Sequence, residues 1–212
     1  MKSIFKKFFK TEEKDDFITI VSGLPRSGTS MMMQMLEAGG LGIVTDNIRK
    51  PDEDNPRGYY EFERVKKIKE DKSWLDECRG KAVKMVSMLL YDLPLDKKYK
   101  IIFMKREMEE MLASQRVMLE RLGQKGGDVS DEEMGKKFEK HLRQVEEWLA
   151  RQENIDVLYV KYNDVLNDSQ KYAEMVSKFL GRNLNVEKMA NVIERSLYRQ
   201  RKDNRAKGMV PK

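Results

Sequence analysis

The sequence contains very few of the residues that build disulfide frameworks and zinc sites. Among its 212 residues are one cysteine, Cys78, and one histidine, His141. A single cysteine excludes an internal disulfide and a CxxC metal site, and a single histidine excludes a histidine-rich zinc site. No carboxylate cluster has the spacing of metal ligands. The sequence therefore predicts no metal site and indicates a reducing compartment, which we expect to be the cytoplasm.

Long apolar runs are also missing. No segment approaches the roughly 18 consecutive apolar residues of a membrane-spanning helix, and the N-terminus lacks the continuous apolar stretch of a secretory signal. Charged residues make up 37% of the chain, and 42 Lys and Arg against 36 Asp and Glu give a formal net charge of +6. A hydrophobic content of 40% is still enough to bury one core. We therefore expect one globular domain.

Residues 1–16 form a basic N-terminal tail in which apolar residues fall at helical spacing between lysines. The apolar residues are Ile4, Phe5, Phe8 and Phe9. A segment of this kind is able to rest on an anionic membrane surface, although such tails more often fray or pack on their own domain. Weak peripheral membrane contact is therefore kept as an alternative role for this tail.

Short apolar segments alternate with amphipathic segments along the rest of the chain. Strands are predicted at residues 17–22, 82–87, 100–105 and 156–162, and helices at residues 29–38, 63–78, 108–122, 130–149, 169–180 and 186–196. The helix at 130–149 begins with a capping box, Ser130 to Glu133, and His141 lies on its apolar face, where we interpret it as a packing residue. This alternation predicts an α/β fold in which helices cover both faces of a parallel sheet.

Residues 23–30, GLPRSGTS, join the first predicted strand to the first helix, and we call them the cradle. Free backbone N–H groups and the helix dipole favour a bound phosphate at such a helix start. The two glycines have the spacing of a Walker A loop, but Thr29 stands where that loop has its phosphate-binding lysine. ATP or GTP hydrolysis is therefore disfavoured. An ordinary strand-to-helix turn would leave the arginine and the hydroxyl residues of the cradle unexplained.

The string LPRSGTS followed by MMMQMLEAGG resembles the 5′-phosphosulfate-binding loop of sulfotransferases that use 3′-phosphoadenosine 5′-phosphosulfate (PAPS), in the PRSGT form of tyrosylprotein sulfotransferases and bacterial relatives. A second motif agrees with it, because Arg106 follows the strand KIIFMK and Ser114 comes eight residues later. In that family an Arg and a Ser at this spacing hold the 3′-phosphate of the cofactor. The sequence departs from the family in having Glu107 and Met108 where Asp-Pro is common.

The resemblance extends from about residue 17 to residue 202, which leaves a basic tail at 1–16 and a C-terminal tail at 203–212. It implies a P-loop nucleotide-kinase-like sulfotransferase fold, with PAPS as the donor and 3′,5′-adenosine diphosphate (PAP) as the product. Arg26 is expected to act on the bridging oxygen and the sulfonate as a catalytic residue. The residues expected to bind the cofactor are Arg26, Ser27, Gly28, Thr29, Ser30, Arg106, Ser114, Arg199 and Arg201. The last two belong to a basic C-terminal segment that closes over the 3′-phosphate in the family, and a solvated end or a weak nucleic-acid patch are the alternatives for it.

An acceptor hydroxyl also needs a base. His141 is far from the position of the family's histidine base, whereas the tyrosylprotein branch uses a glutamate after the first helix. Glu61, in GYYEFE, is therefore expected to be the catalytic base. The alternative is that Glu61 is a solvated acidic residue of a loop with no catalytic role. Lys84 resembles a strand lysine of the family that approaches the sulfonate, although a solvent-facing edge lysine fits the pattern equally well. The neighbours of Glu61 either line an acceptor pocket or pack the loop: Tyr59, Tyr60 and Phe62.

The leading interpretation is a PAPS-dependent sulfotransferase that moves a sulfonate to a hydroxyl or amine of a small-molecule, carbohydrate or lipid acceptor. One rival is a non-catalytic nucleotide-binding or scaffold protein that retains the fold, because the chain is short and lacks an obvious histidine base. Another is a P-loop kinase acting on a small substrate. Neither a recognition helix nor an aromatic stacking motif argues for a nucleic-acid partner. The identity of the acceptor and the oligomeric state stay open.

Overall fold

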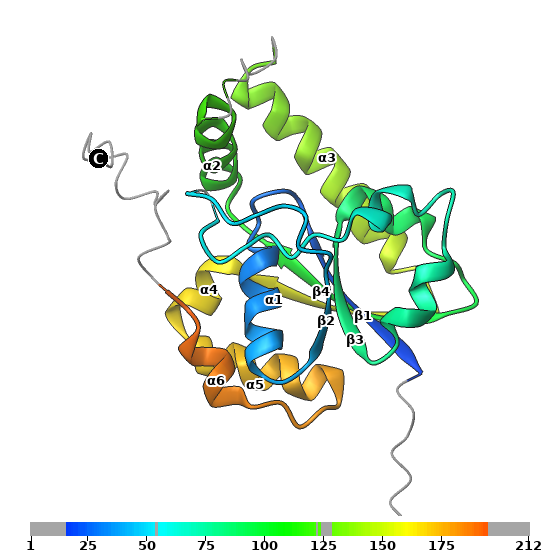
Figure 1. The fold of residues 1–212 in the computed structure, drawn as a ribbon. Coiled ribbons are helices and arrows are strands. Elements are labelled where there is room, and N and C mark those ends of the chain that lie inside the picture. The colour runs from blue at the N-terminus through cyan, green and yellow to red at the C-terminus, as the bar shows by residue number, and fades with distance from the viewer. Residues whose placement is uncertain (1–15, 54, 122, 124–128, 195–212) are drawn as a thin grey trace, which may run out of the picture.

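Five parallel strands form the centre of the structure, a computed structural model that describes residues 16–53, 55–121, 123 and 129–194 (Figure 1). Their order across the sheet is β2-β3-β1-β4-β5, and every neighbouring pair is parallel. The strands are β1 (Phe17–Gly23), β2 (Gly42–Val44), β3 (Lys81–Val86), β4 (Lys98–Lys105) and β5 (Ile155–Lys161). Because all five run in the same direction, their carboxyl ends meet at one edge of the sheet.

The apolar side chains of the strands alternate between two cores, one on each face of the sheet. In β1, Ile18 and Ile20 point to one core and Val21 to the other, and in β4 Ile101 and Ile102 divide in the same way. One face is covered by α1 (Thr29–Ala38), α4 (Tyr162–Asn167), α5 (Ser169–Leu180) and α6 (Val186–Asn191). The other face is covered by α3 (Asp131–Leu149) and by the short 3₁₀ helices η1 (Glu63–Lys67), η2 (Ser73–Cys78) and η3 (Ser87–Asp92). The predicted α/β fold is therefore confirmed.

The helix α2 (Met108–Arg121) follows β4 and lies beside α3, at the top of the molecule in Figure 1. The capping box predicted for α3 is present, because Ser130 Oγ accepts a hydrogen bond from the Glu133 amide at 3.2 Å and the Glu133 carboxylate accepts one from the Ser130 amide. His141 packs as predicted, with its Nε2 2.9 Å from Ser87 Oγ.

The single helix predicted at residues 63–78 is wrong, because the structure has η1 and η2 with a turn between them. Asp71 explains the interruption. Its carboxylate accepts hydrogen bonds from the Ser73 amide at 2.9 Å and from the Ser73 hydroxyl at 2.7 Å, which offers the backbone a local alternative to helical bonding. The charged, helix-like spacing of this segment did not reveal that competition.

Several element boundaries also differ from the predictions. The edge strand β2 and the helix η3 were not predicted, and they are only 3 and 6 residues long. Tyr162, predicted as the end of a strand, begins α4 instead. The last helix, predicted to reach residue 196, ends at Asn191. Residues 195–212, which include the whole C-terminal tail, and residues 1–15 of the N-terminal tail lie outside the described residues.

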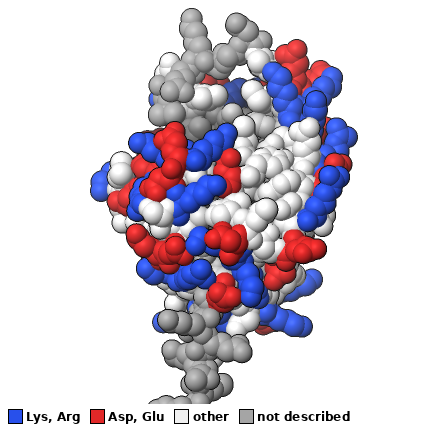
Figure 2. Space-filling view, turned by 90° about the vertical axis from the view of Figure 1, so that its right-hand side faces the viewer, with Lys and Arg blue, Asp and Glu red and all other residues white. Residues whose placement is uncertain are grey.

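The surface carries charges of both signs. Figure 2 shows the side of the molecule that lies to the right in Figure 1, where basic and acidic side chains are interspersed around an uncharged area. Among the described helices, none combines the length and the apolar character that a bilayer crossing requires.

Candidate active site

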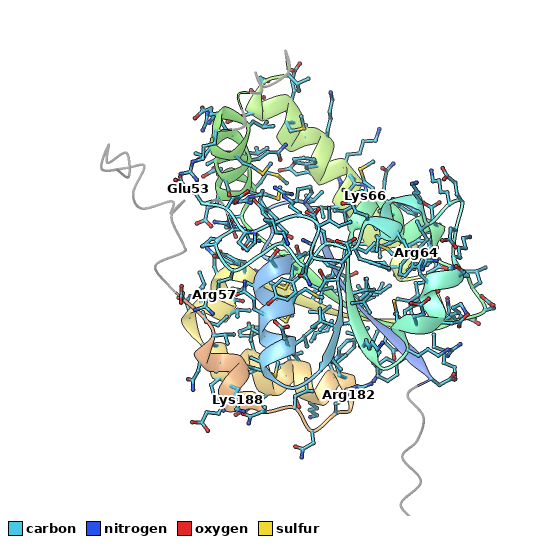
Figure 3. All side chains as sticks on the ribbon, viewed as in Figure 1. Glu53, Arg57, Arg64, Lys66, Arg182 and Lys188 are labelled. Carbon is cyan, nitrogen blue, oxygen red and sulfur yellow. The ribbon has the colours of Figure 1, made fainter. Side chains whose placement is uncertain are left out.

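The cradle lies where the order of the strands reverses. β1 sits between β3 and β4, and in open parallel sheets ligands bind beyond the carboxyl ends of the strands at such a point. A cavity of about 1230 Å³ opens there, and both Glu53 and Lys66 contribute to its wall. Figure 3 shows these two side chains on opposite sides of the region above α1. Small-ligand sites usually measure about 300–1000 Å³, so this cavity is larger than most sites for one small ligand.

The cradle backbone depends on glycine at Gly28. This residue has a φ of 99° and directly precedes α1, and no side chain caps the start of that helix within the described residues. A Cβ on Gly28 would lie only 2.4 Å from the ring of Tyr162. Because the first N–H groups of a helix have no partner inside the helix, the uncapped start of α1 is able to receive an anion.

Arg26 connects the two motifs that were recognised separately in the sequence. Its backbone has a φ of 68°, a conformation that non-glycine residues seldom adopt. Arg106 donates a hydrogen bond from Nη1 to the Arg26 carbonyl at 3.1 Å, and Arg26 donates one from Nε to Ser114 Oγ at 3.0 Å. The cradle therefore lies against both α2 and the residues that precede it, and the hydrogen bond from Arg106 helps to hold the unusual turn in place.

Arg106 is itself held from two directions. Its Nε lies 3.3 Å from Glu110 Oε2, and the side chains of these two residues are only 8% and 3% exposed. The guanidinium carbon lies 4.4 Å from the centre of the Tyr162 ring. An arginine fixed by a buried carboxylate and an aromatic ring is pre-organised, so it loses little side-chain entropy when an anion arrives.

Glu61 reaches the cavity from the loop between β2 and η1, where it meets several cations. Its carboxylate lies 3.0 Å from Arg49 Nη1 and 3.9 Å from the amines of Lys66 and Lys84. The backbone around it is fixed as well, because the Glu61 carbonyl accepts a hydrogen bond from Thr45 Oγ1 at 2.9 Å. The Glu61 side chain is therefore well positioned among three cations.

Lys84, on β3, lies between this loop and the cradle. Its side chain is 12% exposed, and its amine donates hydrogen bonds to the Tyr59 carbonyl and, at 3.5 Å, to Ser30 Oγ. Burial lowers the pKa of Lys84 from 10.5 to about 8, because the ammonium form loses solvation, while the nearby Glu61 opposes this effect. Lys84 is thus an enclosed amine rather than a solvent-facing edge lysine.

Comparison with known proteins identifies the family. Residues 15–211 match the model of the sulfotransferase domain. The chain belongs to the sulfotransferase family. This confirms the resemblance to the sulfotransferase family. No curated protein sequence matches the chain.

Solved structures support the same fold. The mouse sulfotransferase SULT7A1, crystallised with PAP, superimposes with a TM-score of 0.52 at 17% identity, over 84% of this chain and 62% of the mouse chain. The sulfotransferase domain of the Synechococcus PCC 7002 olefin synthase superimposes with a TM-score of 0.50 at 14% identity, over 89% of this chain and 81% of that domain. At such identities the comparisons show the sulfotransferase fold alone.

Most of the predicted site residues of this sulfotransferase line one cavity. These are Arg26, Gly28, Thr29, Ser30, Glu61, Arg106 and Ser114. Ser27 differs, because its side chain is buried and does not line this cavity. Arg199 and Arg201 lie outside the described residues, so their expected role stays a prediction.

Among the aromatic neighbours of Glu61, Tyr59 and Phe62 line the cavity of the sulfotransferase. Tyr60 instead donates a hydrogen bond to Glu37 on α1 at 2.5 Å. Arg49 and Lys66 were missed by the sequence analysis, since no motif marks them and only the folded loop brings them to Glu61. No group of three or more potential metal ligands is found among the described residues.

Proposed function

We propose that this sulfotransferase moves a sulfonate group from PAPS to a hydroxyl or amine of an acceptor. The main support for this proposal is the hydrogen bond between Arg26 and Ser114. It joins the element expected to bind the 5′-phosphosulfate with the element expected to bind the 3′-phosphate, so a single nucleotide is able to contact both. The mouse sulfotransferase with the same fold is crystallised with PAP, which supports PAPS as the donor.

The residues present fit such a donor. The uncapped start of α1 offers backbone N–H groups to the 5′-phosphate, and Gly28 has no side chain to obstruct its approach. When bound, PAPS supplies the activated sulfonate. Arg26 places a permanent positive charge beside the leaving oxygen, which is the main contribution expected of a protein in this kind of transfer. Arg106 and Ser114 hold the 3′-phosphate, and Arg199 and Arg201 are proposed to cover it.

The cavity also accommodates an acceptor. Its wall next to Lys84 contains the apolar side chains of Val86 and Leu89, and α2 contributes Val117 and Met118. A small-molecule, carbohydrate or lipid acceptor bound there would present its hydroxyl toward the cradle. We propose that the protein acts in the cytoplasm, where no disulfide is needed.

The alternatives make different predictions about ligands. A P-loop kinase is disfavoured because Thr29 replaces the phosphate-binding lysine of the cradle. A scaffold protein that retains only the fold would bind PAP without transferring sulfonate. Calorimetric titration with PAP, and separately with ATP and Mg²⁺, distinguishes the nucleotide classes, and a screen of acceptors with radiolabelled PAPS detects transfer. Preference for ATP would contradict the proposal.

Substitution of Arg106 tests the contact with the 3′-phosphate. We expect Arg106→Ala to weaken PAP binding by roughly 2 to 4 kcal/mol, because a charge-assisted contact is lost. Arg116→Ala is the matched control, since Arg116 lies on α2, the helix that follows Arg106, but forms an exposed ion pair with Asp131 at 3.2 Å and does not line the cavity. Unchanged PAP affinity in Arg106→Ala would remove Arg106 from the site.

A further inference from the structure

The amine of Lys84 is arranged as a proton acceptor rather than as a simple surface charge. An ammonium group has three N–H bonds. Two positions around Nζ are directed to the Tyr59 carbonyl and the Ser30 hydroxyl. The remaining position faces the cavity, which Lys84 lines together with Arg26 and Glu61, and the nearest Glu61 oxygen there lies 3.9 Å away, beyond hydrogen-bond distance. A neutral amine that keeps both hydrogen bonds would direct its lone pair to this position.

Glu61 is less suited to accept a proton. Its carboxylate is paired with Arg49 at 3.0 Å and lies 3.9 Å from both Lys66 and Lys84. Both of its carboxylate oxygens therefore already face cations, Oε1 those of Arg49 and Lys84 and Oε2 that of Lys66. Such an arrangement suits Glu61 to hold the lysine in place.

We propose that Lys84, and not Glu61, takes the proton from the acceptor hydroxyl, with Glu61 as a positioning residue. This inference rests on the sulfonate transfer proposed above. Ser30 is the last residue of the cradle and belongs to the first turn of α1. Its contact with Lys84 therefore places the amine beside the end of the cradle, where the transferable group is expected.

The step balances without any further reactant. The acceptor oxygen forms a bond to sulfur, and the bond between sulfur and the bridging oxygen of the donor breaks. The electron pair of that broken bond goes to the phosphate oxygen of PAP, next to the charge of Arg26. The hydroxyl proton moves to neutral Lys84 Nζ and is later released to water.

The surroundings of Lys84 allow the neutral form near physiological pH. Burial lowers the pKa of this lysine to about 8, and the positive charges of Arg49, Arg26 and Lys66 act in the same direction, while Glu61 raises it. A base with a pKa close to the working pH combines a sufficient neutral population with useful proton affinity.

The test compares variants that separate charge from basicity. Lys84→Arg keeps the positive charge but cannot release its proton near neutral pH, and Lys84→Met removes both. The probe reaction is transfer from radiolabelled PAPS to 2-naphthol, a hydroxyl acceptor that needs a base at neutral pH. PAP binding is measured by calorimetry for each variant, so that loss of the site is distinguished from loss of the base.

We expect kcat/KM of the wild-type protein to rise with pH and to level off near pH 8. Both Lys84 variants should bind PAP. Their turnover should fall roughly 100-fold or more, which is the usual contribution of a general base, and their kcat/KM should no longer rise with pH. Glu61→Gln should stay within about tenfold of the wild type, with the rise moved to lower pH because the carboxylate no longer stabilises the ammonium.

Two results would overturn the proposal. In the first, Lys84→Arg remains nearly as active as the wild type, which would leave the lysine only an electrostatic role. In the second, Glu61→Gln loses turnover while the Lys84 variants keep it. A wild-type protein that binds no PAP at all would instead contradict the proposed function.

Discussion

Replacement of Gly28 by alanine tests whether the cradle is built as the structure shows. The left-handed backbone at this position costs an L-amino acid about 1–2 kcal/mol. A Cβ there would also lie 2.4 Å from Cδ2 of Tyr162, a buried ring that Arg106 stacks on. Overpacking of this kind typically costs about 1–3 kcal/mol. We therefore expect Gly28→Ala to lower the free energy of unfolding by roughly 2–5 kcal/mol and to abolish PAP binding.

Gly40→Ala is the matched control. Gly40 has a φ of 93°, close to the 99° of Gly28, but no atom lies within 4 Å of the position of its Cβ. Gly40→Ala should lower the free energy of unfolding only by the backbone cost of about 1–2 kcal/mol, and it should retain PAP binding. Urea denaturation of both variants measures the difference, which isolates the contact with Tyr162. Equal losses in the two variants would refute the close packing of Tyr162 on the cradle.

Three further predictions concern stability and reactivity. The pKa of Lys84 is lower in the folded protein than its ordinary value of 10.5, so the unfolded chain binds that proton more tightly between about pH 8 and 10.5. Urea denaturation of the wild type and of Lys84→Met across this range measures the effect. As pH rises, the free energy of unfolding of the wild type should increase by up to about 3 kcal/mol relative to that of the variant, and a difference that does not change with pH would contradict the burial of Lys84. Burial raises the pKa of the Cys78 thiol to about 12, so a disulfide reagent at pH 8 should label it slowly in the native protein and rapidly in urea, whereas rapid native labelling would show that it is accessible. Ser130→Ala should cost about 1 kcal/mol by urea denaturation because the capping box is lost, and unchanged stability would show that the box contributes nothing.

The fold could be predicted because its signals are local. The alternation of Ile18, Ile20 and Val21 marks a strand buried on both faces, and the glycines and hydroxyls of the cradle mark a phosphate-binding turn. The prediction of one helix at residues 63–78 failed because charged residues at helical spacing also fit two short helices. The hydrogen bonds of Asp71 favour the two short helices over the single one.

The contacts inside the site could not be predicted in the same way. Arg26 and Ser114 are 88 residues apart in the sequence and meet because β1 pairs with β4. The environment of Lys84 is likewise assembled from distant segments, namely the cradle, the loop that carries Glu61, and η1. Motifs therefore named most of the residues, but only the folded chain shows which of them are paired and buried.

The most direct test of the central claim is a calorimetric comparison of PAP with adenosine 5′-monophosphate, which lacks only the 3′-phosphate. If one nucleotide contacts both the cradle and the Arg106–Ser114 pair, the wild-type protein should bind PAP roughly 30-fold or more tightly than the monophosphate, equivalent to about 2 kcal/mol. Arg106→Ala and Ser114→Ala should reduce this preference. Equal affinity of the wild type for the two nucleotides, or an equal loss of both in Arg106→Ala, would contradict the account.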